Sequence, residues 1–187
     1  MKKGFTLIEL LVVIAILAVL MSVIVVTLNP AEMLKKTRDT KRIADLDALR
    51  TAINLYVSDV SSPSMGSSVP SCYASQVGAP ASGTLCSSVT GTTTQAITGG
   101  WIPINFTSIS SGSPLSSLPI DPKNTTSTSA TTSYVYYYGT KTASTTFELD
   151  ANMESNYYSN GGSGDVESKD GGNNSDLYEV GSDLTLF

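Results

Sequence analysis

Apolar residues are concentrated at the start of the chain. From Phe5 to Leu28 the sequence is almost entirely Leu, Ile, Val, Ala and Met, and Glu9 is its only charged residue. A helix rises ~1.5 Å per residue, so this segment is long enough to cross a ~30 Å hydrocarbon core. No small-x-small site typical of secretory signal peptides follows it. The pattern predicts a membrane-spanning helix over residues 5–28, and Lys2 and Lys3 before it favour a cytoplasmic N-terminus.

A second helical pattern covers residues 29–58. Asn29-Pro30-Ala31-Glu32 has the residues of a helix start, because Asn can cap, Pro fits the first helical position and Glu completes a capping box. Apolar side chains then recur at helical spacing, with charged side chains opposite them. These apolar residues are Leu34, Ile43, Leu46, Leu49, Ile53, Tyr56 and Val57. We expect an amphipathic stalk helix whose apolar face packs on the protein's own domain.

The rest of the chain changes in character. Residues 59–100 are rich in Ser, Gly, Thr and Pro and show little periodicity, which predicts a long connecting loop. Strand patterns follow at 101–104, 133–138 and 145–153. The sequence therefore predicts an α+β fold in which residues 101–187 form a small antiparallel β-sheet head laid on the stalk helix.

Two cysteines, Cys72 and Cys86, lie in the predicted loop of a chain that has no histidine. A disulfide that closes a short loop is typical of proteins in oxidising compartments. In a loop-entropy model such a closure stabilises the fold by roughly 3 kcal/mol. Two free buried thiols are the alternative.

Charge separates the stalk from the head. The net charge is -5, and beyond Thr51 the only basic residues are Lys123, Lys141 and Lys169. An acidic head with few lysines argues against direct nucleic-acid binding, which needs a clustered positive surface. The basic residues of the stalk are interleaved with acidic ones, as in a solvated helix with internal ion pairs.

The sequence offers little for catalysis. Without histidine there is no Ser-His-Asp or Cys-His arrangement, and no phosphate-binding or dinucleotide glycine motif is present. Glu148 and Asp150 lie two residues apart on a predicted strand and therefore on one face, a geometry that acid-base chemistry can use. The polar face of an amphipathic strand is the simpler interpretation, so we expect no enzymatic activity.

Acidic residues gather in the Gly/Asn-rich segment 160–176. Asp165, Asp170 and Asp176 are candidate oxygen ligands for Ca²⁺. Their spacing does not fit the EF-hand pattern, because Lys169 and Asp170 occupy positions where a ligand and a glycine are required. A solvated acidic loop without a metal is the alternative that the pattern favours.

Lys3-Gly4-Phe5-Thr6-Leu7-Ile8-Glu9-Leu10, running directly into the apolar segment, resembles the cleavage and assembly motif of type IV pilins and of type II secretion pseudopilins. The resemblance implies that residues 1–4 are a leader, that prepilin peptidase cuts between Gly4 and Phe5, and that it methylates the new amine of Phe5. Glu9 would then dock incoming subunits by pairing with that amine. The alternative is a Glu9 close enough to the membrane interface to stay hydrated.

A second resemblance lies in the head. Leu118-Pro119-Ile120-Asp121-Pro122, followed by a Tyr-rich strand and then Phe147-Glu148-Leu149, is similar to the heads of major pseudopilins and related pilins. The heads of this family are α+β, and those of major pseudopilins carry a C-terminal calcium loop, to which the acidic segment would correspond. No other cofactor is implied.

The resemblance implies a structural subunit of a pilus-like filament. Its partners would be other pilins, prepilin peptidase, an assembly platform and membrane lipids. It would be a single-pass protein of the bacterial inner membrane with its head outside the cytoplasm, later built into a pilus or carried to the cell surface. A secretion pseudopilin and a membrane-anchored adhesive or ligand-binding domain that never polymerises are the alternatives.

Overall fold

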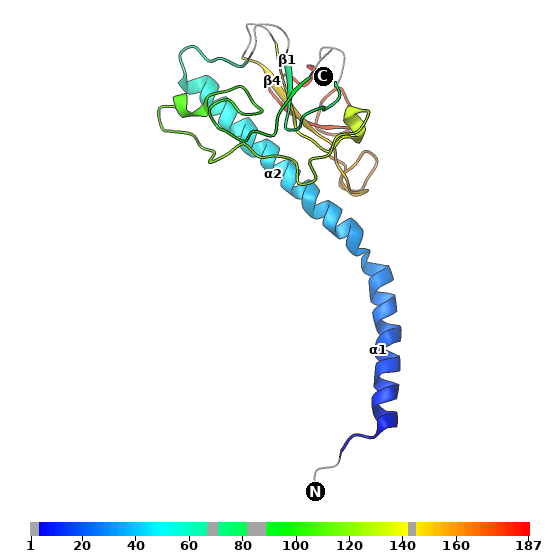
Figure 1. Cartoon of the computed structure of the whole chain (residues 1–187). Helices are drawn as coiled ribbons and strands as arrows, with labels where there is room; N and C mark the ends of the chain where they lie inside the picture. The colour runs from blue at the N-terminus through cyan, green and yellow to red at the C-terminus, as the bar shows by residue number, and fades with distance from the viewer. Residues whose placement is uncertain (1–3, 67–70, 82–88, 142–144) are drawn as a thin grey trace.

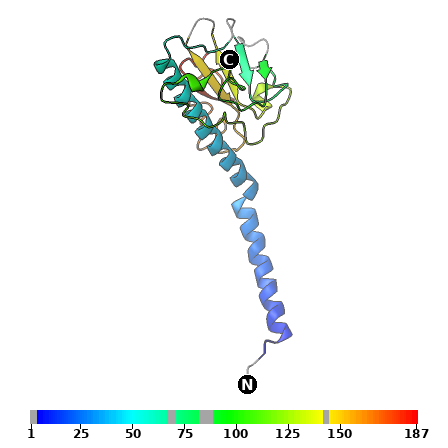
Figure 2. The same cartoon turned by 60° about the vertical axis from the view of Figure 1, so that its left-hand side comes forward.

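The protein is a long bent stem with a head at one end (Figure 1). The computed structural model describes residues 4–66, 71–81, 89–141 and 145–187. Helix α1 spans Leu7–Leu28 and helix α2 spans Pro30–Asp59. Both views show α1 projecting away from the head, whereas the upper part of α2 lies against it (Figures 1 and 2). The two helices predicted from the hydrophobic pattern are therefore present.

The stem bends at Asn29, which ends α1 and caps α2. Its backbone is left-handed, with φ 40° and ψ 70°, a conformation that Asn adopts more readily than most residues. Its side chain accepts a hydrogen bond from the Glu32 N–H, and Pro30 occupies the first turn of α2. The predicted capping box is only half formed: the Glu32 carboxylate lies 3.7 Å from Lys35. Asn29 lacks the extended backbone usual at an N-cap, which explains why the reciprocal bond is missing.

The head contains a mixed five-stranded sheet. The strands are β1 (Ser71–Ala74), β2 (Val89–Gly91), β3 (Tyr137–Thr140), β4 (Phe147–Ala151) and β5 (Tyr178–Gly181), with 3₁₀ turns η1 (Phe106–Ser108) and η2 (Ala130–Thr132). They lie in the order β2-β1-β3-β4-β5. The β1–β2 pair is parallel and the other pairs are antiparallel. The α+β prediction is confirmed, although the sheet is mixed rather than purely antiparallel.

The strand boundaries differ from those predicted. The 145–153 pattern contains β4, but β3 begins only at Tyr137, and residues 101–104 form no strand. Trp101, Ile102 and Ile104 instead supply buried side chains to the core, so their apolar character reflects burial and not strand pairing. Strands β1 and β2 lie within the predicted loop 59–100 and β5 was missed. Such short strands are stabilised by pairing with neighbouring strands, which the local sequence does not reveal.

The main core lies between α2 and one face of the sheet. Its largest members from α2 and the strands are Leu46, Leu49, Ile53, Tyr56, Tyr138, Phe147, Leu149 and Val180. The buried positions of α2 begin at Asp39. Leu34 remains 61% exposed, because the first turns of α2 do not lie against the head. The apolar stripe therefore packs on the protein's own domain over the upper part of α2 only.

The opposite face of the sheet is covered by the C-terminal end of the chain. Leu186 and Phe187 pack there against Tyr137, and the rings of Tyr137 and Phe187 meet edge to face at 6.1 Å. Gly139 makes room for this contact, since a Cβ there would lie 2.6 Å from the Phe187 ring. The polar residues of β4 therefore lie under protein and not in solvent, contrary to the prediction of an amphipathic strand.

Candidate functional site

The N-terminal segment presents an extended peptide followed by a capped helix. Gly4, Phe5 and Thr6 have no regular structure, and Phe5 is 82% exposed. Thr6 caps α1: its side chain accepts from the Glu9 N–H, while Glu9 Oε2 accepts from Thr6 N at 2.8 Å and from Thr6 Oγ1 at 2.7 Å. The Gly4–Phe5 bond is thus accessible, and Glu9 lies one turn beyond it.

Helix α1 is apolar on all sides and has no partner within the described chain. Its large side chains are about half exposed or more, from Leu7 at 83% to Val13 at 47%. By length and composition, Leu7–Val25 can cross a membrane, and none of that span is buried in the head. The helix is therefore compatible with membrane anchoring.

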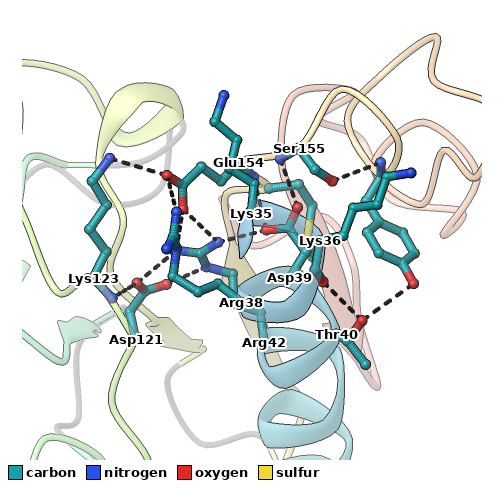
Figure 3. Close-up of polar contacts among 12 residues, drawn as sticks. Lys35, Lys36, Arg38, Asp39, Thr40, Arg42, Asp121, Lys123, Glu154 and Ser155 are labelled. Carbon is teal, nitrogen blue, oxygen red and sulfur yellow. Dashed lines mark hydrogen bonds and ion pairs between the residues drawn. The ribbon is translucent and has the colours of Figure 1, made fainter. Parts of the chain in front are cut away.

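A buried ion network joins the upper stem to the head (Figure 3). Arg42 of α2 is 0% exposed and donates to Asp121 from Nε at 2.6 Å and from Nη2 at 2.9 Å. Its Nη1 donates to Asp39 at 2.6 Å. Burial alone would lower the pKa of Arg42, but hydrogen bonds and charge from Asp121 and Asp39 raise it. Arg42 is therefore a permanent cation held between two carboxylates.

The two carboxylates also bind backbone from separate parts of the head. Asp121 accepts from the N–H groups of Lys123 and Asn124, which fixes the turn that follows Pro119 and Ile120. Asp39 accepts from the N–H groups of Glu154 and Ser155, which follow β4. The Leu-Pro-Ile-Asp-Pro segment noted in the sequence is thus one anchor of the head on the stem.

A second pair reinforces this junction near the surface. Arg38 donates to Glu154 from Nε at 2.7 Å and from Nη2 at 2.8 Å, and Lys123 lies 3.6 Å from the same carboxylate. The Arg38 hydrogen bond lowers the pKa of Glu154 below its ordinary 4.5. Arg38 and Arg42 of α2 therefore form ion pairs with residues of the head, and Arg42 also pairs with Asp39 within the helix.

Three carboxylates meet on the outer face of the sheet. Glu148 and Asp150 come from β4 and Glu179 comes from β5, and one oxygen of each lies within 4.8 Å of the others. All three are at most 1% exposed. Burial, with Glu179 close by, raises the pKa of Glu148 to about 9, and burial also raises the pKa of Asp150 well above its ordinary value. This is the one such group of potential metal ligands among the residues that the structure describes.

The predicted calcium ligands Asp165, Asp170 and Asp176 do not form a comparable group in the described part of the chain. Asp165 accepts hydrogen bonds from Ser168 and Gly161, and these bonds lower its pKa to about 2. Asp170 accepts from the N–H groups of Gly172 and Glu179. Asp165 and Asp170 thus organise the loop itself, and the segment is not merely solvated.

The predicted disulfide lies partly outside the described residues. Cys72 on β1 is 3% exposed and is not a free cysteine. Cys86 falls in 82–88, outside the described residues. The Cys72–Cys86 bond stays a prediction.

Sequence reasoning missed the Arg42 network, and of the three clustered carboxylates it paired only Glu148 and Asp150. Arg42 was taken for a solvated stalk residue, and Glu179 was not singled out at all. A cue was available for the first group, because Asp121 lies between two prolines in a segment that was noted. For the second, only strand pairing across the chain brings Glu179 beside Glu148 and Asp150.

Comparison with protein families supports the N-terminal interpretation. Residues 1–25 match the model of the prokaryotic N-terminal methylation motif. Searches of curated proteins and of solved structures found no match. The matched residues comprise the exposed Gly4–Phe5 bond, the capping glutamate Glu9 and most of the apolar helix. The chain therefore carries, on an N-terminal apolar helix, the methylation motif that is the signature of type IV pilins and pseudopilins.

Proposed function

We propose that this chain is a structural subunit of a type IV pilus-like filament, processed by prepilin peptidase and assembled through its N-terminal helix. One observation carries the proposal: α1, which begins within the methylation motif, is apolar on every side and projects from the head, with none of Leu7–Val25 buried by the described part of the chain (Figure 1). Such a helix needs an apolar surrounding. Lipid supplies it before assembly, and α1 helices of other copies supply it in a filament.

The geometry of Glu9 suits pairing between subunits. Both hydrogen bonds from Thr6 go to Oε2, and no described hydrogen bond uses Oε1. The carboxylate can therefore keep its capping role and also accept from the amine of Phe5 in a neighbouring copy. An unpaired carboxylate in the hydrocarbon layer costs roughly 2.5 to 3.5 kcal/mol on insertion scales. That cost would penalise any register in which Glu9 lacks its partner.

The same helix defines the proposed topology. Lys2 and Lys3 precede it, and positive residues favour the cytoplasmic side. The chain would cross the inner membrane once, with α2 and the head outside. Secretion pseudopilins share this motif and arrangement, so the assembly machine that takes up the subunit decides between the two.

Processing is tested by intact and N-terminal peptide mass spectrometry of the chain from cells that carry a prepilin peptidase. The expected product begins at N-methylated Phe5. A chain that keeps residues 1–4, or one that is cut after Leu28, would contradict the proposal.

Assembly is tested by measuring sheared surface filaments from cells expressing Glu9→Ala. We expect filament yield to fall at least about tenfold, which corresponds to ~1.4 kcal/mol per subunit. Two matched controls separate charge from helix capping. Thr6→Ala removes the cap but keeps the carboxylate, and Glu32→Ala removes the glutamate at the equivalent position of α2. Both should assemble within a few-fold of wild type; equal yields of Glu9→Ala and wild type would refute the proposed pairing.

A further inference from the structure

Strand register places three acidic residues side by side on the outer face of the sheet. Asp150 on β4 is directly opposite Glu179 on β5, and Glu148 lies two residues before Asp150 on the same face. Glu148 is flanked across the sheet by Gly139 and Gly181, so no neighbouring side chain separates it from the others. Like charges directly opposite in a sheet are destabilising. The arrangement therefore requires a compensating group.

Four carboxylate oxygens of this group have no hydrogen-bond donor among the described residues. Glu148 Oε2 accepts from Leu186 N at 2.5 Å, and Glu179 Oε2 accepts from Asn174 N at 2.9 Å. Their remaining oxygens, together with both oxygens of Asp150, are buried and have no hydrogen-bond partner among the described residues. Asp150 itself is 0% exposed. Four unpartnered oxygens thus belong to three buried carboxylates that approach one another to within 4.8 Å, in a site closed to solvent.

No basic side chain of the described chain neutralises this group. Every described ion pair involves other carboxylates. Lys141, which directly follows β3, pairs with Asp183 at 2.7 Å. Asp170 adds further negative charge next to Glu179, because its Oδ2 accepts a hydrogen bond from the Glu179 N–H at 2.7 Å. Buried charge without a partner is costly, and a bound cation is one way to offset it.

From these contacts we infer that Glu148, Asp150 and Glu179 form a binding site for a hard divalent cation, with Ca²⁺ as the preferred ion. Two oxygens on opposite sides of a Ca²⁺ ion at ~2.4 Å lie ~4.8 Å apart, and the three carboxylates have oxygens within 4.8 Å of one another. Carboxylates exclude the softer metals that prefer thiolate or imidazole. Mg²⁺ gives up its water ligands reluctantly, so a buried all-carboxylate site favours Ca²⁺.

The surrounding chain explains what the ion would do. The backbone of Leu186 and Asn174 contacts the ligand carboxylates, so the C-terminal end and the loop before β5 would be held by the same site. Gly172 lies against the Glu179 carboxylate, where a Cβ would collide with it. The ion would therefore join β4, β5 and the C-terminus. This site is independent of filament assembly and differs from the loop ligands Asp165, Asp170 and Asp176 expected by resemblance.

The test is the melting temperature of the full chain in detergent, refolded from urea in either EDTA or about 1 mM CaCl₂, a concentration that occupies extracellular calcium modules. Refolding matters because ligands from separate strands assemble only as the head folds. We expect Ca²⁺ to raise the wild-type Tm by roughly 5 °C or more, with one Ca²⁺ per chain in native mass spectrometry. The same concentration of MgCl₂ should give a smaller rise.

Asp150→Asn is the decisive variant and Asp165→Asn its matched control. Asp150→Asn should lose the Ca²⁺-dependent rise and melt in EDTA at or above the wild-type temperature, because the amide cannot carry the negative charge that burial beside Glu148 and Glu179 disfavours. Asp165→Asn should keep the rise. Glu179→Gln repeats the test if Asp150→Asn does not fold. Equal wild-type Tm in Ca²⁺ and EDTA would overturn the site in favour of carboxylates neutralised by protons. A rise abolished by Asp165→Asn but retained by Asp150→Asn would place the ion in the loop instead.

Discussion

Replacing Asp121 with Asn removes one charge from the buried network of Figure 3 and hardly changes the shape of the side chain. Arg42 donates two hydrogen bonds to Asp121, and each bond to a charged group contributes ~1.5–3 kcal/mol. The amide keeps one acceptor oxygen but presents an NH₂ group to the guanidinium, so about half of this interaction is lost. We therefore expect Asp121→Asn to lower the free energy of unfolding by about 3 kcal/mol, the lower end for breaking a buried ion pair.

Urea unfolding of the full chain in detergent, followed by tryptophan fluorescence, measures this change. Trp101 is the only tryptophan, it is 0% exposed, and its Nε1 donates to Pro119 O at 2.8 Å, two residues from Asp121. With a slope of ~2 kcal/mol per molar urea, the midpoint should fall by ~1.5 M. Asp47→Asn is the control, because the Asp47–Arg50 pair is 48% and 46% exposed and should contribute at most ~0.5 kcal/mol.

A double-mutant cycle with Arg42→Met isolates the pair. Once the guanidinium is gone, Asp121→Asn should cost little, so we expect a coupling energy of about 2 kcal/mol between the two positions. Two results would refute the claim that this network stabilises the head on the stem. One is a loss of unfolding free energy for Asp121→Asn that lies within about 1 kcal/mol of the loss for Asp47→Asn. The other is a coupling energy near zero.

Two further predictions concern acid stability and packing. Arg38 lowers the folded pKa of Glu154, so the Arg38–Glu154 pair stabilises the fold above pH ~4.5, and this stabilisation is lost as the pH falls through the folded pKa. The urea midpoint should therefore decline less steeply between pH 6 and 3 for Glu154→Gln than for wild type. An equally steep decline in both proteins would contradict this. Gly139→Ala places a methyl group against the Phe187 ring and should lower the free energy of unfolding by about 1–3 kcal/mol. Gly161→Ala is the control, because no atom of the described residues lies near the added methyl group and it should not act through packing. Faster hydrogen exchange at the Leu186 amide in Gly139→Ala would show that the C-terminus is displaced.

The helical part of the fold was predictable because its signals are local. The uninterrupted apolar segment ending at Leu28, the Asn29-Pro30 start and the stripe from Leu46 to Tyr56 each follow from helix geometry and capping chemistry. The junction itself was less predictable. The left-handed backbone of Asn29 and the ion pair of Glu32 with Lys35 depend on how two helix ends meet.

The strands of the head were less predictable, since short strands gain their stability from neighbours. Strands β1 and β2 lie in a Ser/Gly-rich stretch without periodic signal, and β5 is only four residues long. Residues 101–104 have strand-like composition, yet they fill the core as irregular chain. Burial and strand pairing both select apolar residues, and the sequence pattern does not separate the two causes.

By itself, the sequence determined the apolar helix, the amphipathic stalk and the methylation motif at residues 1–25, because adjacent residues carry each of these signals. Tertiary structure alone decided what the charges of the head do. Asp121 meets Arg42 across 79 positions, and Glu179 meets Asp150 only through the register of β4 and β5. Whether a carboxylate is solvated, paired or gathered into a metal site depends on which distant segments fold over it, and no local pattern contains that information.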